Sequence, residues 1–202
     1  MGSRMYLALV PPTEVLESID ELVERMRERS QLRDPRRQDP RRLRWIQPGD
    51  AHITLAFMAS VSDPEGLADA LTADLDTVVP VSIGLSGAGA FPDPVTAKVL
   101  WLGVSDPADA LPTLARRVRS AAHGAGAQPE GGPFSPHLSV ARCRPGDVTG
   151  EIDALSGFSA PAWRARSAIL FESHVGSRGA RHQPVAEIVL NGLDRSQFRS
   201  PK

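Results

Sequence analysis

The sequence predicts an α+β fold made of two similar lobes, and three observations support this prediction. The chain has 202 residues, 41% of them hydrophobic and 23% charged, which is ordinary for a soluble globular domain. Helix-like and strand-like segments continue along the whole chain, with no linker long enough to separate independent domains. The order of these segments in the first half recurs loosely in the second half. We therefore expect residues 1–202 to form a single bilobal domain.

The first half of the chain alternates between strand and helix patterns. Residues 1–4 are expected to be unstructured, whereas an apolar run over residues 6–10 predicts a short buried strand. Thr13 suits a helix N-cap, and apolar residues three and four positions apart predict a helix that ends near Arg29. Similar patterns predict a strand, a helix and two further strands over residues 52–58, 64–75, 81–85 and 97–104.

The second half follows a related order. Apolar spacing of three and four predicts a helix, which is followed by a passage rich in glycine and proline and then by a strand. A weaker helix and two strands complete the chain. These segments cover residues 109–123, 124–136, 137–143, 147–155, 164–173 and 185–190.

Composition excludes several classes of protein. No apolar run approaches the roughly 20 residues that a membrane-spanning helix needs, so we expect neither a membrane helix nor a secretory signal. Cys143 is the only cysteine, which excludes an internal disulfide and a cysteine-based zinc site. The formal net charge of −1 provides no general positive field for nucleic acid. These features are typical of a cytoplasmic protein, and we expect a monomer that needs no cofactor.

One short stretch is nevertheless strongly basic. Residues 30–44 combine six arginines with two prolines, a composition that predicts a flexible loop. One interpretation is a solvated surface loop, and the other is a loop that contacts phosphate groups. The arginines are Arg33, Arg36, Arg37, Arg41, Arg42 and Arg44.

The most informative feature is a tetrapeptide pattern that occurs twice, as His52-Ile53-Thr54-Leu55 and as His137-Leu138-Ser139-Val140. In each copy a histidine stands two positions before a hydroxyl residue. Because residues i and i+2 of a strand point to the same face, each histidine projects with its hydroxyl partner. If the two lobes pack together around a groove, two imidazoles and two hydroxyls converge.

These four groups suit phosphodiester cleavage. Histidine titrates near pH 6.5, so at neutral pH one imidazole can accept a proton while the other donates one. In-line displacement at phosphorus places the attacking and leaving oxygens on opposite sides, which fits two histidines from two lobes. The hydroxyls of Thr54 and Ser139 can donate hydrogen bonds to the non-bridging phosphate oxygens.

The other histidines lack this context. His123 ends a predicted helix, and His174 and His182 lie outside the paired motif, so we expect surface roles for all three. A lone histidine on a strand is more often structural than catalytic, and it is the repetition that favours catalysis. Neither motif histidine has a second ligand at the spacing of a His-Glu-x-x-His site, so no metal site is expected.

In the order and spacing of its motifs the chain resembles the two-histidine phosphoesterases, and within them the RNA 2′,3′-cyclic phosphodiesterases, historically called 2′-5′ RNA ligases. The resemblance extends over nearly the whole chain. It is carried by residues 6–12, 44–45, 52–57, 89–92, 99–104, 136–142, 170–173 and 179–181.

The resemblance implies two antiparallel sheets with outer helices and a positively lined central groove. It also implies hydrolysis of an RNA terminal 2′,3′-cyclic phosphate to a 2′-phosphate, with Arg142 supporting the phosphate site. The chain departs from the family in two places. Ser139 replaces a commoner threonine, and His182 stands where a tyrosine often follows the Gly-Ala-Arg segment. The basic loop is also longer than the family leads us to expect.

We expect His52 to be the proton donor to the 3′-oxygen and His137 the proton acceptor for water, with the roles exchanged in a reverse ligation. The expected substrate is RNA with a 2′,3′-cyclic phosphate end. Two alternatives stay open: a related enzyme that acts on a small cyclic nucleotide, and an RNA-binding module without turnover. The second fits less well because binding alone needs no paired acid and base. Candidate RNA contacts are Arg36, Arg37, Arg41, Arg42 and Trp45.

Overall fold

The computed structural model describes residues 2–33, 43–176 and 179–193, and these residues form four helices and nine strands. The helices are α1 (Thr13–Arg33), α2 (Pro64–Leu75), α3 (Ala110–Gly124) and α4 (Thr149–Leu155). The strands are β1 (Ser3–Leu9), β2 (Leu43–Trp45), β3 (Ile53–Val61), β4 (Val81–Phe91), β5 (Ala97–Ser105), β6 (His137–Gly146), β7 (Ser159–Ala165), β8 (Ser167–Gly176) and β9 (Gly179–Val189). The predicted α+β class is confirmed.

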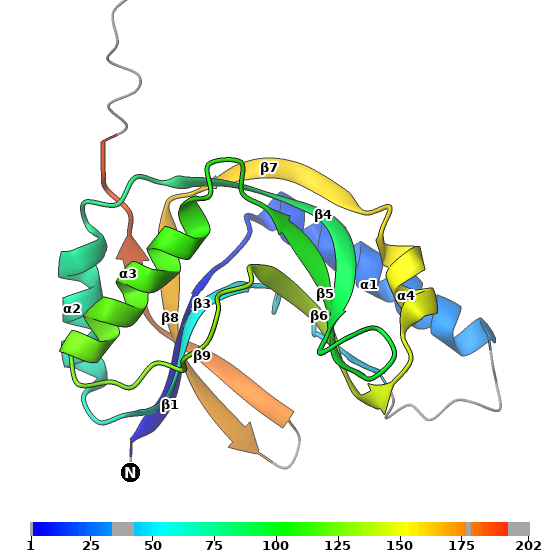
Figure 1. Ribbon diagram of the computed structural model, residues 1–202, viewed down its shortest axis with the longest axis horizontal. Helices are drawn as coiled ribbons and strands as arrows, with labels where there is room; N and C mark the ends of the chain where they lie inside the picture. The colour runs from blue at the N-terminus through cyan, green and yellow to red at the C-terminus, as the bar shows by residue number, and fades with distance from the viewer. Residues whose placement is uncertain (1, 34–42, 177–178, 194–202) are drawn as a thin grey trace, which may run out of the picture.

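The strands form one curved sheet in which the paired strands are antiparallel (Figure 1). The order along the sheet is β7-β4-β5-β6-β3-β1-β8-β9, and β2 pairs separately with β6. A single registered pair, Ile53 with Leu138, joins β3 to β6. We call this pair the seam, because it divides the sheet into two smaller sheets, one in each lobe.

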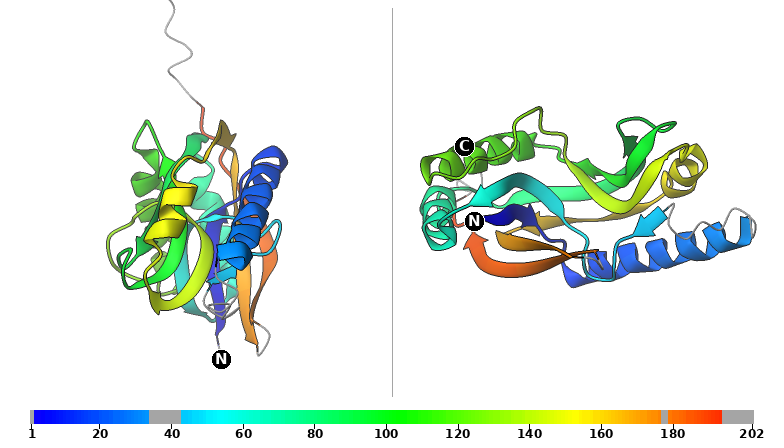
Figure 2. Two further views of the ribbon diagram at one scale, coloured as in Figure 1. Left: turned by 90° about the vertical axis from the view of Figure 1, so that its right-hand side faces the viewer. Right: turned by 90° about the horizontal axis from the view of Figure 1, so that it is seen from below.

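Each lobe combines one of these smaller sheets with two helices. The first lobe contains β1, β3, β8 and β9 with α2 and α3, and the second contains β2, β4, β5, β6 and β7 with α1 and α4. Figure 1 shows α2 and α3 at one end of the molecule and α1 and α4 at the other, and the right-hand view of Figure 2 shows the same arrangement. The lobes do not coincide with the two halves of the sequence, because β8 and β9 return to β1. Repeated passage between the lobes explains why no linker separates them.

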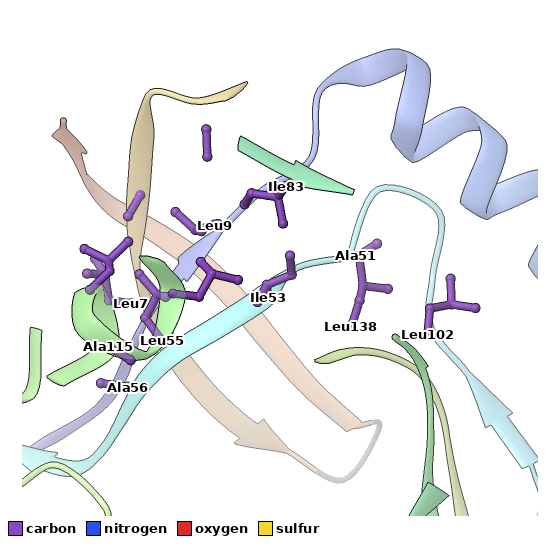
Figure 3. Close-up of a cluster of buried hydrophobic side chains, with 14 of the residues drawn as sticks. Leu7, Leu9, Ala51, Ile53, Leu55, Ala56, Ile83, Leu102, Ala115 and Leu138 are labelled. Atoms are coloured by element: carbon purple, nitrogen blue, oxygen red, sulfur yellow. The ribbon is translucent and has the colours of Figure 1, made fainter. Parts of the chain in front are cut away.

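The apolar faces of the helices form part of the hydrophobic core. Asp63 caps α2 by accepting a hydrogen bond of 2.9 Å from the amide of Gly66, and Pro64 takes the first helical position. Figure 3 shows that the core continues across the seam, where Ile53 and Leu138 lie among other buried side chains. The buried residues that the two helices of the first lobe contribute are Leu67, Leu71, Leu75, Leu111, Leu114, Ala115, Val118 and Ala122.

The start of the chain is more ordered than its local pattern indicates. β1 begins at Ser3, so the predicted unstructured start is wrong for Ser3 and Arg4. The reason is a long-range partner, since Ser3 pairs with Val61 of β3. A strand stabilised by a distant partner leaves no signal in its own few residues.

The predicted basic loop over residues 30–44 is too long at both ends. α1 continues to Arg33, and residues 43–45 form β2, which pairs with β6. Arg27 connects these parts by donating a hydrogen bond of 2.7 Å from Nη2 to the carbonyl of Ile46. Arg36, Arg37, Arg41 and Arg42 lie outside the described residues.

The predicted strand over residues 164–173 is in fact two strands. β7 ends at Ala165 and pairs with β4, whereas β8 begins at Ser167 and pairs with β1 and β9. The chain therefore changes lobes at Arg166, whose carbonyl accepts a hydrogen bond of 2.8 Å from the amide of Leu190. A local pattern cannot reveal this crossing because both segments have strand character.

Candidate active site

The seam places the two histidine motifs side by side in the sheet. Ile53 and Leu138 are direct partners in an antiparallel pair. Residues that flank such a pair lie across from one another, so His52 is opposite Ser139, and Thr54 is opposite His137. All four side chains therefore project from a small area of one side of the sheet, which we call the histidine face.

The burial of the motif side chains agrees with this placement. Ile53 and Leu138 have exposed fractions of 0% and belong to the hydrophobic core. The four motif side chains on the opposite side are half-buried, as expected for groups that line a site and still reach solvent. The structure thus brings together His52, Thr54, His137 and Ser139.

Both imidazoles are held in the same way by the chain just before them. His52 Nδ1 lies 2.7 Å from the carbonyl oxygen of Asp50, and His137 Nδ1 lies 2.8 Å from that of Ser135. Because a carbonyl oxygen can only accept a hydrogen bond, each Nδ1 carries the proton. Each ring therefore presents Nε2 as the atom that takes up or gives up a proton.

Aromatic rings surround His52. Its ring stacks on Tyr6 with 5.0 Å between the centroids, and Tyr6 stacks in turn on Phe171 at 5.0 Å. His182 of β9 meets the edge of Tyr6 at 5.3 Å and lies 6.1 Å from His52. Burial and the negative charge of Asp50 raise the pKa of Tyr6 well above its ordinary value, so the phenol keeps its proton.

These surroundings lower the pKa of His52. Burial is the main cause, and positive charges on His182 and His137 act in the same direction, whereas Asp50 opposes them. The pKa of His182 is lowered as well, mainly by burial and further by the positive charge of Arg142, again against Asp50. Both imidazoles therefore favour the neutral form at neutral pH.

His137 has different neighbours. Its ring makes an edge contact with Phe91, with 4.9 Å between centroids and 85° between planes, and Trp101 lies 6.5 Å away. Trp101 lies so close to Gly89 that a Cβ at that position would collide with the indole ring. The Nε1 of Trp101 is buried and has no hydrogen-bond partner in the part of the chain that the structure describes. The wall beside His137 thus contains an unused donor.

A β-bulge lies at the fourth residue of each motif, at Leu55 and at Val140. Between two successive pairs with β1, the pairing advances by two residues along β3, from Thr54 to Ala56, but by only one residue along β1. In the same way, the pairing of β6 with β5 advances by two residues along β6, from Ser139 to Ala141, but by only one residue along β5. The extra residue in each strand makes two consecutive residues face the core. The residue five positions after each histidine consequently returns to the histidine face, and these residues are Phe57 and Arg142.

The bulge decides where Arg142 lies. Strict alternation from His137 would place this residue on the core side with Leu138 and Val140. The structure instead leaves Arg142 exposed on the histidine face, where the resemblance led us to expect a phosphate contact. On the first lobe, the guanidinium of Arg4 lies over the ring of the equivalent residue, Phe57, 5.4 Å from the ring centroid.

Trp45 lies away from the place where an RNA contact was expected. Trp45 is half-buried, packs against the hydrophobic core and is the partner of buried Ala141. The preceding residue, Arg44, points to the other face and is exposed. Arg44, and not Trp45, therefore lies on the histidine face.

Sequence reasoning gave His182 no place in the site and did not select Asp50. His182 is exposed, in keeping with the surface role expected of it, and it also contacts Tyr6 and lies near His52. The available signal was its place directly after Gly-Ala-Arg, where the resembling family often has an aromatic residue. Asp50 holds His52 through its carbonyl and acts on three site residues through its charge. His174 is half-exposed beside Glu172, in keeping with the surface role expected of it.

Within residues 2–33, 43–176 and 179–193 no group of three or more His, Cys, Asp or Glu side chains is placed to hold a metal ion. No helix of the described residues is both long and apolar enough to cross a membrane.

The fold and the paired motifs define a class of protein in which each of two lobes contributes one histidine and one hydroxyl residue to a shared face. A family model of the 2′-5′ RNA ligase superfamily matches residues 11–176, which is most of the chain. The chain therefore belongs to the 2′-5′ RNA ligase superfamily.

Curated relatives match part of the chain. An RNA 2′,3′-cyclic phosphodiesterase of Geobacillus stearothermophilus is 34% identical over 120 residues, which are 57% of this chain and 37% of that protein. A protein of the same name from Aquifex aeolicus is 28% identical over 133 residues, covering 63% of this chain and 66% of that protein. The match thus spans less than two thirds of the length of each relative.

Solved structures are similar over almost the whole chain. The protein TT0787 of Thermus thermophilus has a TM-score of 0.70 at 21% identity, covering 94% of this chain and 98% of that chain. LigT of Escherichia coli in complex with NADP+ has a TM-score of 0.64 at 23% identity, covering 95% and 99%. At these identities the likeness establishes the fold.

Proposed function

We propose that the protein hydrolyses RNA terminal 2′,3′-cyclic phosphates to 2′-phosphates by acid–base catalysis with two histidines. The observation that carries the proposal is the seam, which places His52 and Thr54 beside His137 and Ser139 on one face. Two imidazoles with Nε2 exposed for proton transfer and two hydroxyl donors are sufficient for displacement at phosphorus without a metal ion.

The proposed reaction is an in-line attack of water on the cyclic phosphate. The new bond joins the water oxygen to phosphorus, and the bond between phosphorus and the 3′-oxygen breaks. His137 accepts the proton of the water, and His52 donates a proton to the leaving 3′-oxygen. Thr54 and Ser139 donate hydrogen bonds to the non-bridging oxygens, and the charge of Arg142 favours the anion.

The lowered pKa of His52 bears on these roles. A proton donor must be charged before the reaction, and burial of His52 favours its neutral form. A bound phosphate anion raises the pKa of a nearby imidazole, which restores the proton in the complex. The exchanged assignment, with His52 as acceptor, needs no such restoration. A substrate whose 3′-oxygen is replaced by sulfur separates the two assignments.

The relatives support the substrate class. The proteins matched from Geobacillus stearothermophilus and Aquifex aeolicus are named RNA 2′,3′-cyclic phosphodiesterases. LigT of Escherichia coli, which shares the fold, has been crystallised in complex with 3′-AMP and with phosphate. We extend the proposal to the reverse reaction, in which a 5′-hydroxyl replaces water and a 2′-5′ linkage forms, because microscopic reversibility uses the same groups. We also propose that the protein acts as a monomer in the cytoplasm.

The test is incubation of the purified protein, in excess EDTA, with an oligoribonucleotide that ends in a 2′,3′-cyclic phosphate. We expect a 2′-phosphate product, resolved from the 3′-phosphate isomer by chromatography. A 3′-phosphate product would reverse the leaving group. RNA binding without any product would contradict the enzymatic proposal, and turnover of a mononucleoside cyclic phosphate alone would indicate a small-molecule substrate.

A further inference from the structure

A basic pocket lies on the second lobe next to the motif side chains. It has a volume of about 320 Å³ and is lined by Arg44, Arg142, Cys143 and Arg144. Two adjacent strands supply the lining, β2 through Arg44 and β6 through the other three residues. Three guanidinium groups around one pocket make a binding site for an anion.

The pairing of these strands brings like charges together. Arg44 and Arg142 are direct partners in the antiparallel pair of β2 and β6. Like charges at such positions destabilise a sheet. In the part of the chain that the structure describes, no carboxylate forms an ion pair with Arg44 or Arg142, and both are exposed. A bound anion would offset the repulsion that the fold leaves in place.

The pocket extends along β6 away from the catalytic groups, and Arg142 is the residue that it shares with the proposed site of the reacting phosphate. The bulge at Val140 returns Arg142 to the histidine face, and Arg144 follows two residues later on the same side. At about 3.3 Å per residue, Arg142 lies roughly 10 Å and Arg144 roughly 17 Å along the strand from Ser139. The charge of Arg142 also reaches His182, whose ring is 6.1 Å from that of His52. A short oligonucleotide spans this distance, whereas a mononucleotide held at the histidines does not.

We propose that Arg44 and Arg144, which line the pocket beyond Arg142, form a second phosphate subsite, which binds an internucleotide phosphate of RNA upstream of the terminal cyclic phosphate. The inference rests on the proposed function and deepens it by making the protein selective for the end of an RNA chain over a mononucleotide. Arginine suits this task because its planar guanidinium donates two parallel hydrogen bonds to a phosphate. The subsite contributes to substrate binding and leaves the chemistry to the histidines.

The test compares two substrates with the same terminal nucleoside: an oligoribonucleotide ending in a 2′,3′-cyclic phosphate and the mononucleoside 2′,3′-cyclic phosphate. For Arg44→Gln we expect KM for the oligonucleotide to rise about tenfold, the effect of losing one charged hydrogen-bonding group. We expect kcat on the oligonucleotide and both constants on the mononucleotide to stay unchanged. Arg144→Gln should act in the same direction, and Arg44→Lys, which keeps the charge, should lose less.

The control is Arg116→Gln, which removes an equal charge from an exposed position on α3. This variant should behave as the unchanged protein on both substrates. The salt dependence of KM provides a second measurement. If Arg44→Gln loses one phosphate contact, the slope of log KM against the logarithm of the salt concentration should become shallower by about 0.7 for the single-stranded oligonucleotide. Thermal unfolding of each variant checks that the fold is intact.

The outcomes separate this inference from the proposed function. Equal KM values for Arg44→Gln, Arg144→Gln and the unchanged protein on the oligonucleotide would overturn the subsite and leave the catalytic proposal standing. Equal losses on both substrates would also overturn it, because the arginines would then act on the reacting phosphate. No turnover of either substrate by the unchanged protein would overturn the proposed function, and the subsite with it.

Discussion

The two lobes carry the same backbone device in opposite chemical surroundings. In each, a histidine is held by a carbonyl two residues before it, a hydroxyl follows, and a bulge returns the residue five positions after the histidine to the histidine face. On the first lobe that residue is Phe57, and aromatic rings and a third imidazole surround His52. On the second lobe it is Arg142, which belongs to a cluster of arginines.

The difference shows how a repeated motif can serve unequal roles. The shared backbone fixes where the two Nε2 atoms lie, and side chains outside the motifs set how readily each imidazole takes a proton. Burial among aromatic rings lowers the pKa of His52, while the second lobe places positive charge where a polyanion can bind. The two histidines can therefore have different roles although the backbone holds them in the same way.

The largest effect should follow from removing either imidazole. We expect His52→Ala and His137→Ala each to lower kcat/KM by about 10²- to 10⁴-fold, the range for general acid–base groups. The double variant should lose little more than the worse single variant, because the two act as a unit. Steady-state kinetics on the cyclic-phosphate oligonucleotide measure this, with circular dichroism as the check on folding. Near-normal activity in either variant would remove that histidine from the mechanism.

A leaving group that needs no proton should distinguish the donor from the acceptor. With sulfur in place of the 3′-oxygen, the departing thiolate is stable near neutral pH because thiols ionise at about pH 8.5. If His52 is the donor, His52→Ala should recover most of its activity on this substrate and His137→Ala should not. The reverse result would assign His52 as the acceptor.

The pH profile should follow the same assignment. For a donor His52, kcat/KM falls as pH rises through its lowered pKa, and for an acceptor it falls as pH drops through that value. The measurement is kcat/KM across pH 5 to 8, with unfolding followed at each pH. A profile that stays flat from well below the ordinary pKa of histidine up to pH 8 would contradict both assignments.

Loss of a hydroxyl should have an intermediate effect. We expect Thr54→Val and Ser139→Ala each to lower kcat by about 10- to 100-fold, since each removes one donor to the phosphate oxygens. Thr54→Ser and Ser139→Thr keep the hydroxyl and should retain most of the activity. If the variants without a hydroxyl were as active as the variants that keep it, hydrogen bonding by these residues would not contribute to catalysis.

The smallest effect concerns the environment of His52. Replacing His182 with glutamine removes an imidazole whose protonated form disfavours protonated His52, so the pKa of His52 should rise towards its ordinary value. The rise should be partial because burial, the larger cause, persists. Titration of the imidazole protons by NMR measures it. His174→Gln is the matched control, since His174 is half-exposed beside Glu172 and should leave His52 unchanged.

Much of this arrangement could be predicted from the sequence because it is local. The α2 helix has the predicted bounds, and the alternation of the motifs predicted which side chains share a face. What the sequence did not reveal depends on partners far along the chain. The bulge that turns Arg142 outward is defined by pairing with β5, and the proximity of His182 to His52 is produced by β9 returning to the first lobe. Trp45 likewise packs against the core because β2 pairs with β6.

The seam has one more consequence, a mechanical one. The two smaller sheets share one registered backbone pair, and the reacting side chains flank that pair directly. In any rotation of one lobe against the other, points close to the pivot move least and distant points move most. A rotation about this pair would therefore change the spacing of the two imidazoles less than the distance from the first lobe to the arginine pocket.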